Sequence, residues 1–164
     1  MIEKLKKLIK KTTPGFTLTE LIIIIILIGI FATMAMMRTR DGVSTIQQQI
    51  AIDQITSDID LVKSMAFAKH DTITIVFSTN NEQYAIFIGP DGSRTALSDF
   101  PNSNSGVISF DNATFRNVNI SSANFNGTSE LQFLPLGEPK SGGSIVLNTK
   151  TISIENVTGK WTIN

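Results

Sequence analysis

One acidic residue at the edge of a long apolar run is the feature of this sequence that most needs a chemical explanation. Glu20 stands directly before residues 21–37, where no side chain is charged. A lone charge inside a bilayer costs about 2.5–3.5 kcal/mol on insertion scales, so such a residue usually has a partner and a purpose. Opposite charges attract more strongly in apolar surroundings than in water. The chemistry expected of Glu20 is therefore an ion pair.

Few other residues could do chemistry. The chain has no cysteine and one histidine, His70, so thiolate chemistry is excluded and histidine-based metal clusters cannot be built. His70 follows an expected helix and is predicted to occupy its C-terminal capping position. Asp58 and Asp60 do not share a helix face, because residues two apart point away from each other. Asp91 and Gly92 predict a turn without calcium-loop spacing. We predict no enzymatic activity and no cofactor.

The charge is unevenly distributed along a chain whose formal net charge is zero. The first 15 residues hold five lysines and one glutamate, and the remainder holds 9 basic and 13 acidic residues, a net charge of −4. An acidic remainder repels phosphate groups, so nucleic-acid binding receives no general electrostatic support. The composition therefore argues against DNA as a partner.

The apolar run is long enough to cross a membrane. Residues 16–37 reach the lower bound of about 17–25 residues for a spanning helix and show no polar face. The lysines before the run outnumber Arg38 and Arg40 after it, which predicts a cytoplasmic N-terminus and a translocated C-terminal part. Such an N-terminus fits a secretory signal, with Thr33 and Ala35 as a poor cleavage site, or an uncleaved anchor. A third interpretation rests on residues 15–20.

The stretch "TTPGFTLTELIIIIILIGI" resembles the type IV prepilin (class III) signal, in which a basic leader ends in glycine before phenylalanine, a glutamate at the fifth mature position and an apolar run. The resemblance implies that residues 1–15 are a leader, which a prepilin peptidase removes between Gly15 and Phe16. It also implies N-methylation of the new amino group of Phe16. In the family, the glutamate pairs with the N-terminal ammonium of a neighbouring subunit or of its own, so Glu20 would register subunits during assembly. Alternatively, Glu20 only favours the helix macrodipole in the first turn.

The chain is predicted to continue as one long helix, residues 16–69, with a transmembrane part at 16–37 and an amphipathic stem at 43–69. Apolar residues recur in the stem at a spacing of three to four, while Asp53 and Asp60 fall on the opposite side. A separate apolar stripe could meet a neighbouring stem. The first set is Ile52, Ile55, Ile59, Val62 and Ala66, and the stripe is Val43, Ile46 and Ile50.

Residues 71–164 predict a β-rich head. Short runs of alternating β-branched and aromatic residues, separated by turn signals, are typical of half-buried antiparallel strands. The predicted fold is α+β and pilin-like, with the long helix packed on an antiparallel, sandwich-like sheet. The expected strands are residues 72–78, 83–89, 107–110, 130–136, 144–148, 151–155 and 160–164.

The last third of the chain, residues 131–163, resembles the C-terminal part of GspH/FimT-type minor pilins and pseudopilins. The resemblance rests on one aromatic residue, three glycines and one basic residue: Phe133, Gly137, Gly143, Gly159 and Lys160. Residues 102–129 are rich in Asn and Ser, and their role is left open. The units "ATFRN", "VNISS" and "ANFNG" are too few for a solenoid and are expected to form short strands and loops, a candidate region for subunit-specific contacts. Four Asn-x-Ser/Thr sequons, at Asn112, Asn119, Asn126 and Asn156, indicate surface loops.

The resemblances together imply a minor pilin or pseudopilin of a type II secretion pseudopilus or a type IV pilus. Its expected partners are the prepilin peptidase/methylase, other pilin or pseudopilin subunits, an inner-membrane assembly platform, and lipid before assembly. Its expected location is the bacterial inner membrane, with the C-terminus periplasmic, and then the filament. Two alternatives remain. The first is a FimT-like DNA-uptake pilin, which is expected to have a basic C-terminal patch, whereas here Lys160 stands alone beside Trp161. The second is an anchored β-domain that never polymerises.

Overall fold

The computed structural model describes residues 15–164, except for the side chains of residues 37–42. Most of the predicted leader, residues 1–14, therefore lies outside the described residues. The chain divides into two compact units, Met1–Asp41 and Gly42–Asn164. We call them the N-terminal unit and the C-terminal unit. One helix, α2 (Leu18–Lys69), contributes residues to both units.

The stem part of α2 turns one face into the core of the C-terminal unit. Each of the five apolar residues predicted for this face, from Ile52 to Ala66, is at most 1% exposed, and Asp53 and Asp60 are exposed. The 3.6-residue period alone places these residues on one side of a helix. The amphipathic prediction for this segment agrees with the structure.

The end of α2 is closed by backbone hydrogen bonds around His70. The N–H of His70 donates to the carbonyl of Phe67 (3.4 Å), and the N–H of Asp71 donates to the carbonyl of Ala66 (3.3 Å). His70 adopts a positive φ of 49°. This pairing is a Schellman motif with His70 at the position after the cap. The predicted capping position of His70 is confirmed.

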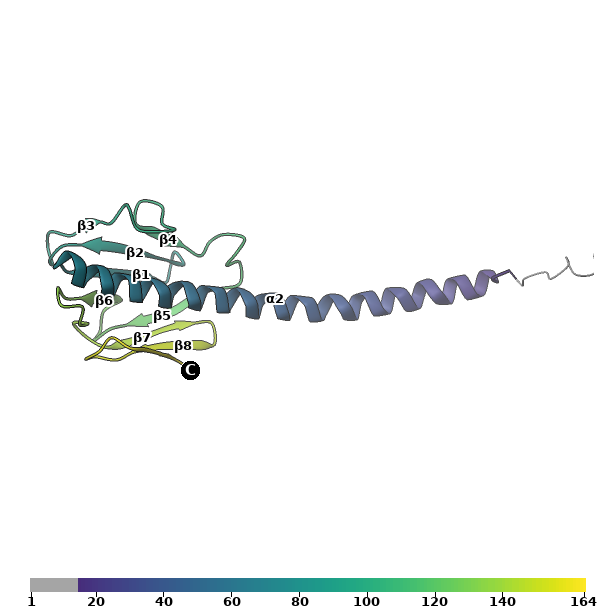
Figure 1. The fold of residues 1–164 in the computed structure, drawn as a ribbon. Coiled ribbons are helices and arrows are strands. Elements are labelled where there is room, and N and C mark those ends of the chain that lie inside the picture. Colours follow the sequence, from purple (N-terminus) through teal and green to yellow (C-terminus); the bar gives the residue numbers. More distant parts are fainter. Residues whose placement is uncertain (1–14) are drawn as a thin grey trace, which may run out of the picture. The chain divides into compact units, whose positions relative to one another are not determined.

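Two antiparallel sheets flank α2 in the C-terminal unit (Figure 1). The first sheet has the order β3-β2-β1-β6, with β4 also paired to β2, and the second has the order β5-β7-β8-β9. The strands are β1 (Ile73–Ser78), β2 (Gln83–Ile88), β3 (Thr95–Ala96), β4 (Val107–Ser109), β5 (Ile120–Asn124), β6 (Glu130–Phe133), β7 (Gly143–Leu147), β8 (Lys150–Ile154) and β9 (Trp161–Ile163).

Alternate residues of both sheets join α2 in one core. On β1, Ile73, Ile75 and Phe77 are buried, as the period of two requires. The other strands of the core contribute Tyr84, Ile86, Leu131, Phe133, Ile145, Leu147, Ile152 and Ile154. The predicted α+β fold, a long apolar helix followed by antiparallel sheets, is confirmed.

At two of the glycines named in the C-terminal resemblance, steric constraints explain why the residue is glycine. A Cβ on Gly143 would overlap with the carbonyl oxygen of Asn124 and the ring of Phe125, because β7 lies directly against the end of β5. Gly159 has a φ of 65°, which disfavours other residues, and a Cβ there would lie 3.0 Å from the ring of Phe133. These positions preserve close packing between the strands and their turns.

Candidate assembly site

The chain around the predicted cleavage site is accessible. Residues 15–17 are non-helical, and α2 begins at Leu18. The side chain of Phe16 is 78% exposed, and a Cβ placed on Gly15 would meet no atom within 4 Å. The peptide bond between Gly15 and Phe16 therefore lies in an exposed, non-helical segment, which is open to a protease.

Glu20 is bonded to Thr17 in a reciprocal capping box. The backbone N–H and the hydroxyl of Thr17 both donate to Oε2 of Glu20, at 3.0 and 3.1 Å. In return, the N–H of Glu20 donates to Oγ1 of Thr17 at 3.2 Å. This arrangement satisfies two backbone donors that a helix start leaves without partners. The carboxylate is thereby directed towards the residues that precede the helix.

The first half of α2 is apolar and is not covered by other described residues. Leu18–Met36 is long and apolar enough to span a membrane, and none of its residues is buried. It is the one helix of this kind among the described residues. Its isoleucines are between 38% and 61% exposed, whereas those of the stem core are at most 1% exposed. Such a surface requires lipid or other apolar helices around it.

The predicted second stripe of the stem is also uncovered. Val43, Ile46 and Ile50 are 50%, 61% and 42% exposed. Their spacing of three and four places them on one side of α2, away from the buried face. The stripe therefore offers a second apolar surface on the C-terminal unit.

A buried carboxylate links the stem to the first sheet. Asp58 is 4% exposed, and it accepts a short hydrogen bond from the hydroxyl of Tyr84 and two bonds of 3.0 Å from Nε2 of Gln54. Burial raises the pKa of Asp58, and these hydrogen bonds offset part of the rise. The pKa of Tyr84 is raised by its burial and by the neighbouring charge of Asp58. This pair fixes the position of α2 against β2.

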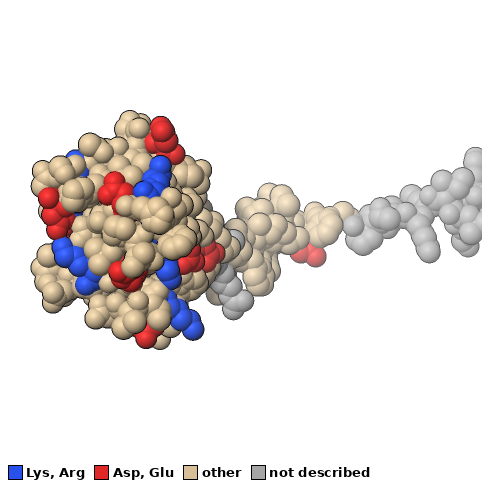
Figure 2. All heavy atoms as spheres, turned by 60° about the vertical axis from the view of Figure 1, so that its left-hand side comes forward, with Lys and Arg blue, Asp and Glu red and all other residues tan. Residues whose placement is uncertain are grey.

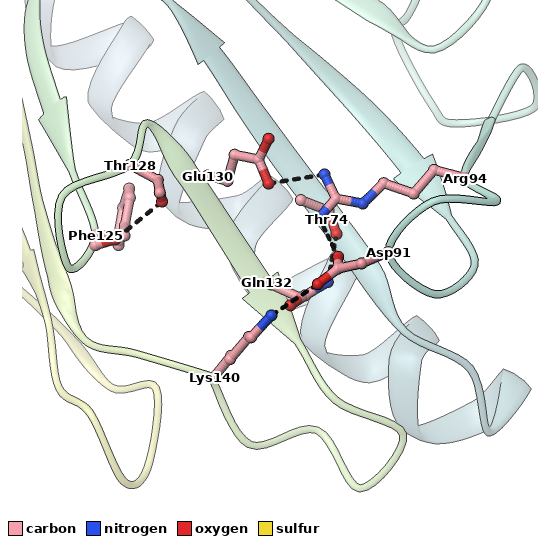
Figure 3. A network of polar contacts seen from close by, with 8 residues as sticks. All are labelled: Thr74, Asp91, Arg94, Phe125, Thr128, Glu130, Gln132 and Lys140. Atoms are coloured by element: carbon pink, nitrogen blue, oxygen red, sulfur yellow. Dashed lines mark hydrogen bonds and ion pairs between the residues drawn. The ribbon is translucent and has the colours of Figure 1, made fainter.

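A second polar network surrounds Asp91 in the turn between β2 and β3 (Figure 3). Its carboxylate accepts hydrogen bonds from Lys140 (2.8 Å), Gln132 (2.8 Å) and Arg94. Arg94 also contacts Glu130 at 2.7 Å. The bonds from Lys140, Arg94 and Gln132 lower the pKa of Asp91 well below its usual range. The network ties the turn to β6 and to the chain that enters β7.

The charges on the C-terminal unit do not form a basic patch at its C-terminal end. Figure 2 shows basic and acidic side chains interspersed on the visible face. Lys160 is exposed, but the indole of Trp161 donates from Nε1 to Oδ2 of Asp60 at 3.1 Å. Trp161 is therefore held against α2. Among the described side chains, no group of three or more His, Cys, Asp or Glu could hold a metal ion.

A comparison with protein-family models shows the family to which the chain belongs. The model of the family described as type II transport protein GspH matches residues 51–163, well over half of the chain. The chain belongs to the GspH family. The GspH/FimT-type resemblance of its C-terminal third is thus confirmed, and so is the prediction of a non-enzymatic structural subunit. An apolar N-terminal helix in this family is consistent with anchoring in the inner membrane.

Two solved structures share the fold of this GspH-family chain. Both are described as the minor pseudopilin EpsH from the type II secretion system of Vibrio cholerae. The first has a TM-score of 0.57 and 7% identity, covering 72% of this chain and 95% of its own. The second has a TM-score of 0.54 and 8% identity, covering 71% and 94%. A comparison with curated proteins gives no match.

Sequence reasoning placed Gly15, Phe16 and Glu20 around the start of α2, and the structure has them there. It missed the contact between Thr17 and Glu20, although a Thr-x-x-Glu spacing before an apolar run is a signature of a capping box. It also missed the burial of Asp58. The sequence signal that could have indicated it was Tyr84, the one tyrosine of the chain. A tyrosine hydroxyl that is buried in a strand needs a hydrogen-bond partner, and here that partner is Asp58.

Proposed function

We propose that this chain is a minor pseudopilin, assembled through its N-terminal helix into the pseudopilus of a type II secretion system. The observation that carries the proposal is the GspH family match over residues 51–163 in a chain whose helix α2 has an apolar, unburied part at Leu18–Met36. Two structures of the same fold are named as minor pseudopilins of such a system. The type II assignment takes precedence over the type IV pilus for this reason.

In the proposed mechanism, the lysine-rich leader first keeps the N-terminus in the cytoplasm and the C-terminal unit in the periplasm. A prepilin peptidase then cuts between Gly15 and Phe16 and methylates the new amino group of Phe16. The exposure of this segment supports the cut. Removal of the lysines frees the apolar helix to leave the lipid and join other helices on an inner-membrane assembly platform.

Glu20 is the proposed registration group. In the capping box, Oε2 of Glu20 already receives two bonds from Thr17. Cleavage places the ammonium of Phe16 one residue before Thr17, so a cation appears next to the acceptor. A carboxylate can accept about four hydrogen bonds, and Glu20 therefore keeps capacity for the ammonium of its own chain or of a neighbour. Pairing relieves the cost of an unpaired charge in apolar surroundings.

Two surfaces would be covered by other pseudopilins in the assembled fibre. The first is the lipid-facing surface of Leu18–Met36, and the second is the stripe of Val43, Ile46 and Ile50. Both consist of large apolar side chains at helical spacing, which pack against similar helices by interlocking ridges and grooves. Assembly would thus replace lipid contacts by helix–helix contacts along one helix.

Pseudopilus formation in a host with the secretion genes tests the proposal. We expect Glu20→Ala to remain in the inner membrane while the parent chain enters sheared fibres. Lys150→Ala, at the exposed start of β8, serves as the matched control and should assemble like the parent. Equal recovery of Glu20→Ala and the parent in the fibre fraction would contradict the role of Glu20. Absence of both would contradict the pseudopilin assignment.

A further inference from the structure

A polar groove opens on the C-terminal unit between the turn that joins β1 to β2 and the segment that follows β4. Its volume is about 690 Å³, within the range of about 300–1,000 Å³ that small-ligand sites occupy. The first wall includes Asn80, Asn81 and Gln83, and the second includes Asp111 and Arg116. Amide groups therefore line much of the groove.

Glu82 joins the two walls. It adopts a positive φ of 47°, uncommon for a residue other than glycine. Its carbonyl oxygen accepts from the N–H of Phe110 (2.8 Å), and its Oε2 accepts from the N–H of Ile120 (2.5 Å). The turn is thus bonded to both ends of the opposite wall. A groove with walls fixed in this way loses little conformational entropy when a ligand enters.

The opposite wall is also held from behind by α2. Nδ2 of Asn117 donates to Oε1 of Gln47 (2.9 Å), and Nε2 of Gln47 donates to the carbonyl of Ala113 (3.4 Å). Within the wall, Oδ1 of Asn112 accepts from the N–H of Thr114 at 2.9 Å. These bonds give a loop of polar residues a defined conformation. The Asn-rich segment, which the sequence analysis named as a candidate region for subunit-specific contacts, is therefore an ordered wall.

Several side chains of the groove keep their hydrogen-bonding capacity free. Four side chains make no hydrogen bond to the described part of the chain: the side-chain amides of Asn80, Asn81 and Gln83 and the guanidinium of Arg116. Each amide both donates and accepts, and the guanidinium only donates. The charged groups are mixed, since Glu82 and Asp111 line the groove together with Arg116. A polyanion would meet two carboxylates, and an apolar ligand would leave the amides unpaired.

From this lining we infer that the groove binds an uncharged saccharide chain bearing hydroxyl and acetamido groups. Hydroxyls donate and accept in the same way as the side-chain amides, and an acetamido group is itself an amide that pairs with them. Arg116 donates to the hydroxyl or carbonyl oxygens of the sugar without requiring a negative charge. The site lies in the C-terminal unit and does not depend on the pseudopilin assignment.

The full chain, nitrogen-15-labelled in micelles of a phosphocholine detergent, is the protein for the test, because this detergent contains no sugar. Titration with the fully N-acetylated chitin tetramer, tetra-N-acetylchitotetraose, should shift the amide signals of residues 79–83 and 109–119 saturably, including the side-chain amides of Asn80 and Asn81. Arg116→Ala should weaken binding at least about fivefold, as expected for the loss of one or two hydrogen bonds. Lys150→Ala, outside the groove, should bind like the parent.

Three results would overturn the inference. The first is the absence of saturable shifts in a folded, well-dispersed spectrum, and the second is an Arg116→Ala variant that binds as tightly as the parent. The third is a neutral Gly/Ser peptide that shifts the same signals more strongly than the sugar, which would assign the groove to a protein partner. Asn81→Ala provides an independent variant in the exposed turn if Arg116→Ala perturbs the fold.

Discussion

Thr17 and Glu20 hold each other at the first turn of α2, because the hydroxyl and N–H of Thr17 bind the carboxylate while the N–H of Glu20 binds the hydroxyl. The carboxylate proposed to register subunits is thus already positioned in the uncleaved chain. The same contact starts the helix one residue after Thr17. Helix initiation and the proposed registration of subunits would then depend on one pair of residues.

The capping role can be measured separately from assembly. Thr17→Val removes the hydroxyl but keeps the shape, and Thr17→Ser keeps the cap. Loss of an N-cap costs about 0.5–2 kcal/mol, so the backbone amides of Glu20 and Leu21, which donate to Thr17, should exchange hydrogen several-fold faster in Thr17→Val. Hydrogen exchange of the chain in nanodiscs measures this. Identical exchange in the valine and serine variants would show that the capping box does not stabilise the helix start.

The buried pair of Asp58 and Tyr84 should couple strongly. Tyr84→Phe removes a donor from a buried carboxylate and should lower the free energy of unfolding by about 1.5–3 kcal/mol. The loss should be smaller in an Asp58→Asn background, where no buried charge remains. Urea unfolding followed by the fluorescence of Trp161, the one tryptophan, gives the double-mutant cycle. Additive losses would contradict direct coupling.

The same pair predicts a pH dependence. Because burial raises the pKa of Asp58 in the folded state, the folded chain binds this proton more tightly than the unfolded chain. The free energy of unfolding should therefore fall as pH rises from the ordinary aspartate pKa through the raised one. Asp58→Asn should lack this component, so its curve should differ in slope from that of the parent within that window and run parallel to it above the window. Curves that stay parallel within the window would contradict an Asp58 pKa raised by burial.

Asp91 predicts a pH dependence of the free energy of unfolding with the sign opposite to that of Asp58. Its pKa is lowered by Lys140, Arg94 and Gln132, so its stabilising contribution is present above the ordinary aspartate pKa and is lost as pH falls below it. Asp91→Asn should lower the free energy of unfolding at neutral pH. Added salt should reduce this difference between the variant and the parent, because the site is exposed. Asp99→Asn, at an exposed acid that forms no ion pair with the described residues, is the control. Equal stability of the two variants at low salt would contradict the network.

The absence of native cysteine allows a direct test of the stem stripe. Ile46→Cys, placed in the middle of the stripe, should form disulfide-linked or reagent-linked oligomers in fibres and few in membranes before assembly. Lys150→Cys lies at an exposed start of β8 and should cross-link far less. Both variants are read from non-reducing gels. Equal cross-linking at the two positions would show that the stripe is no packing surface.

Sequence patterns predicted the features that depend on local periodicity. The helical spacing from Ile52 to Ala66 and the alternation along β1 describe how each element meets the core. The strand β3 was missed because Thr95 and Ala96 are both exposed. For β5 the sequence predicted only short strands and loops without bounds, because Ile-Ser-Ser-Ala-Asn has neither alternation nor strong β-propensity. Only pairing with β2 and β7 makes them strands.

The polar networks could not be predicted in the same way, because their members are far apart in sequence. Asp91 meets Gln132 and Lys140 only after β6 has paired with β1 and the chain has turned towards β7. Asp58 lies beside the predicted core face, and its burial depends on the position of Tyr84 on β2. The largest cause of each pKa shift comes from the tertiary structure: burial for Asp58 and the bond from Lys140 for Asp91.

The proposed cleavage creates the cation with which Glu20 is to pair, so the identity of the N-terminal residue tests the central claim most directly. Top-down mass spectrometry of the chain recovered from its native host should find N-methylated Phe16 as the first residue, with residues 1–15 removed. A chain that still begins at Met1 and carries the five lysines of its leader would contradict the account.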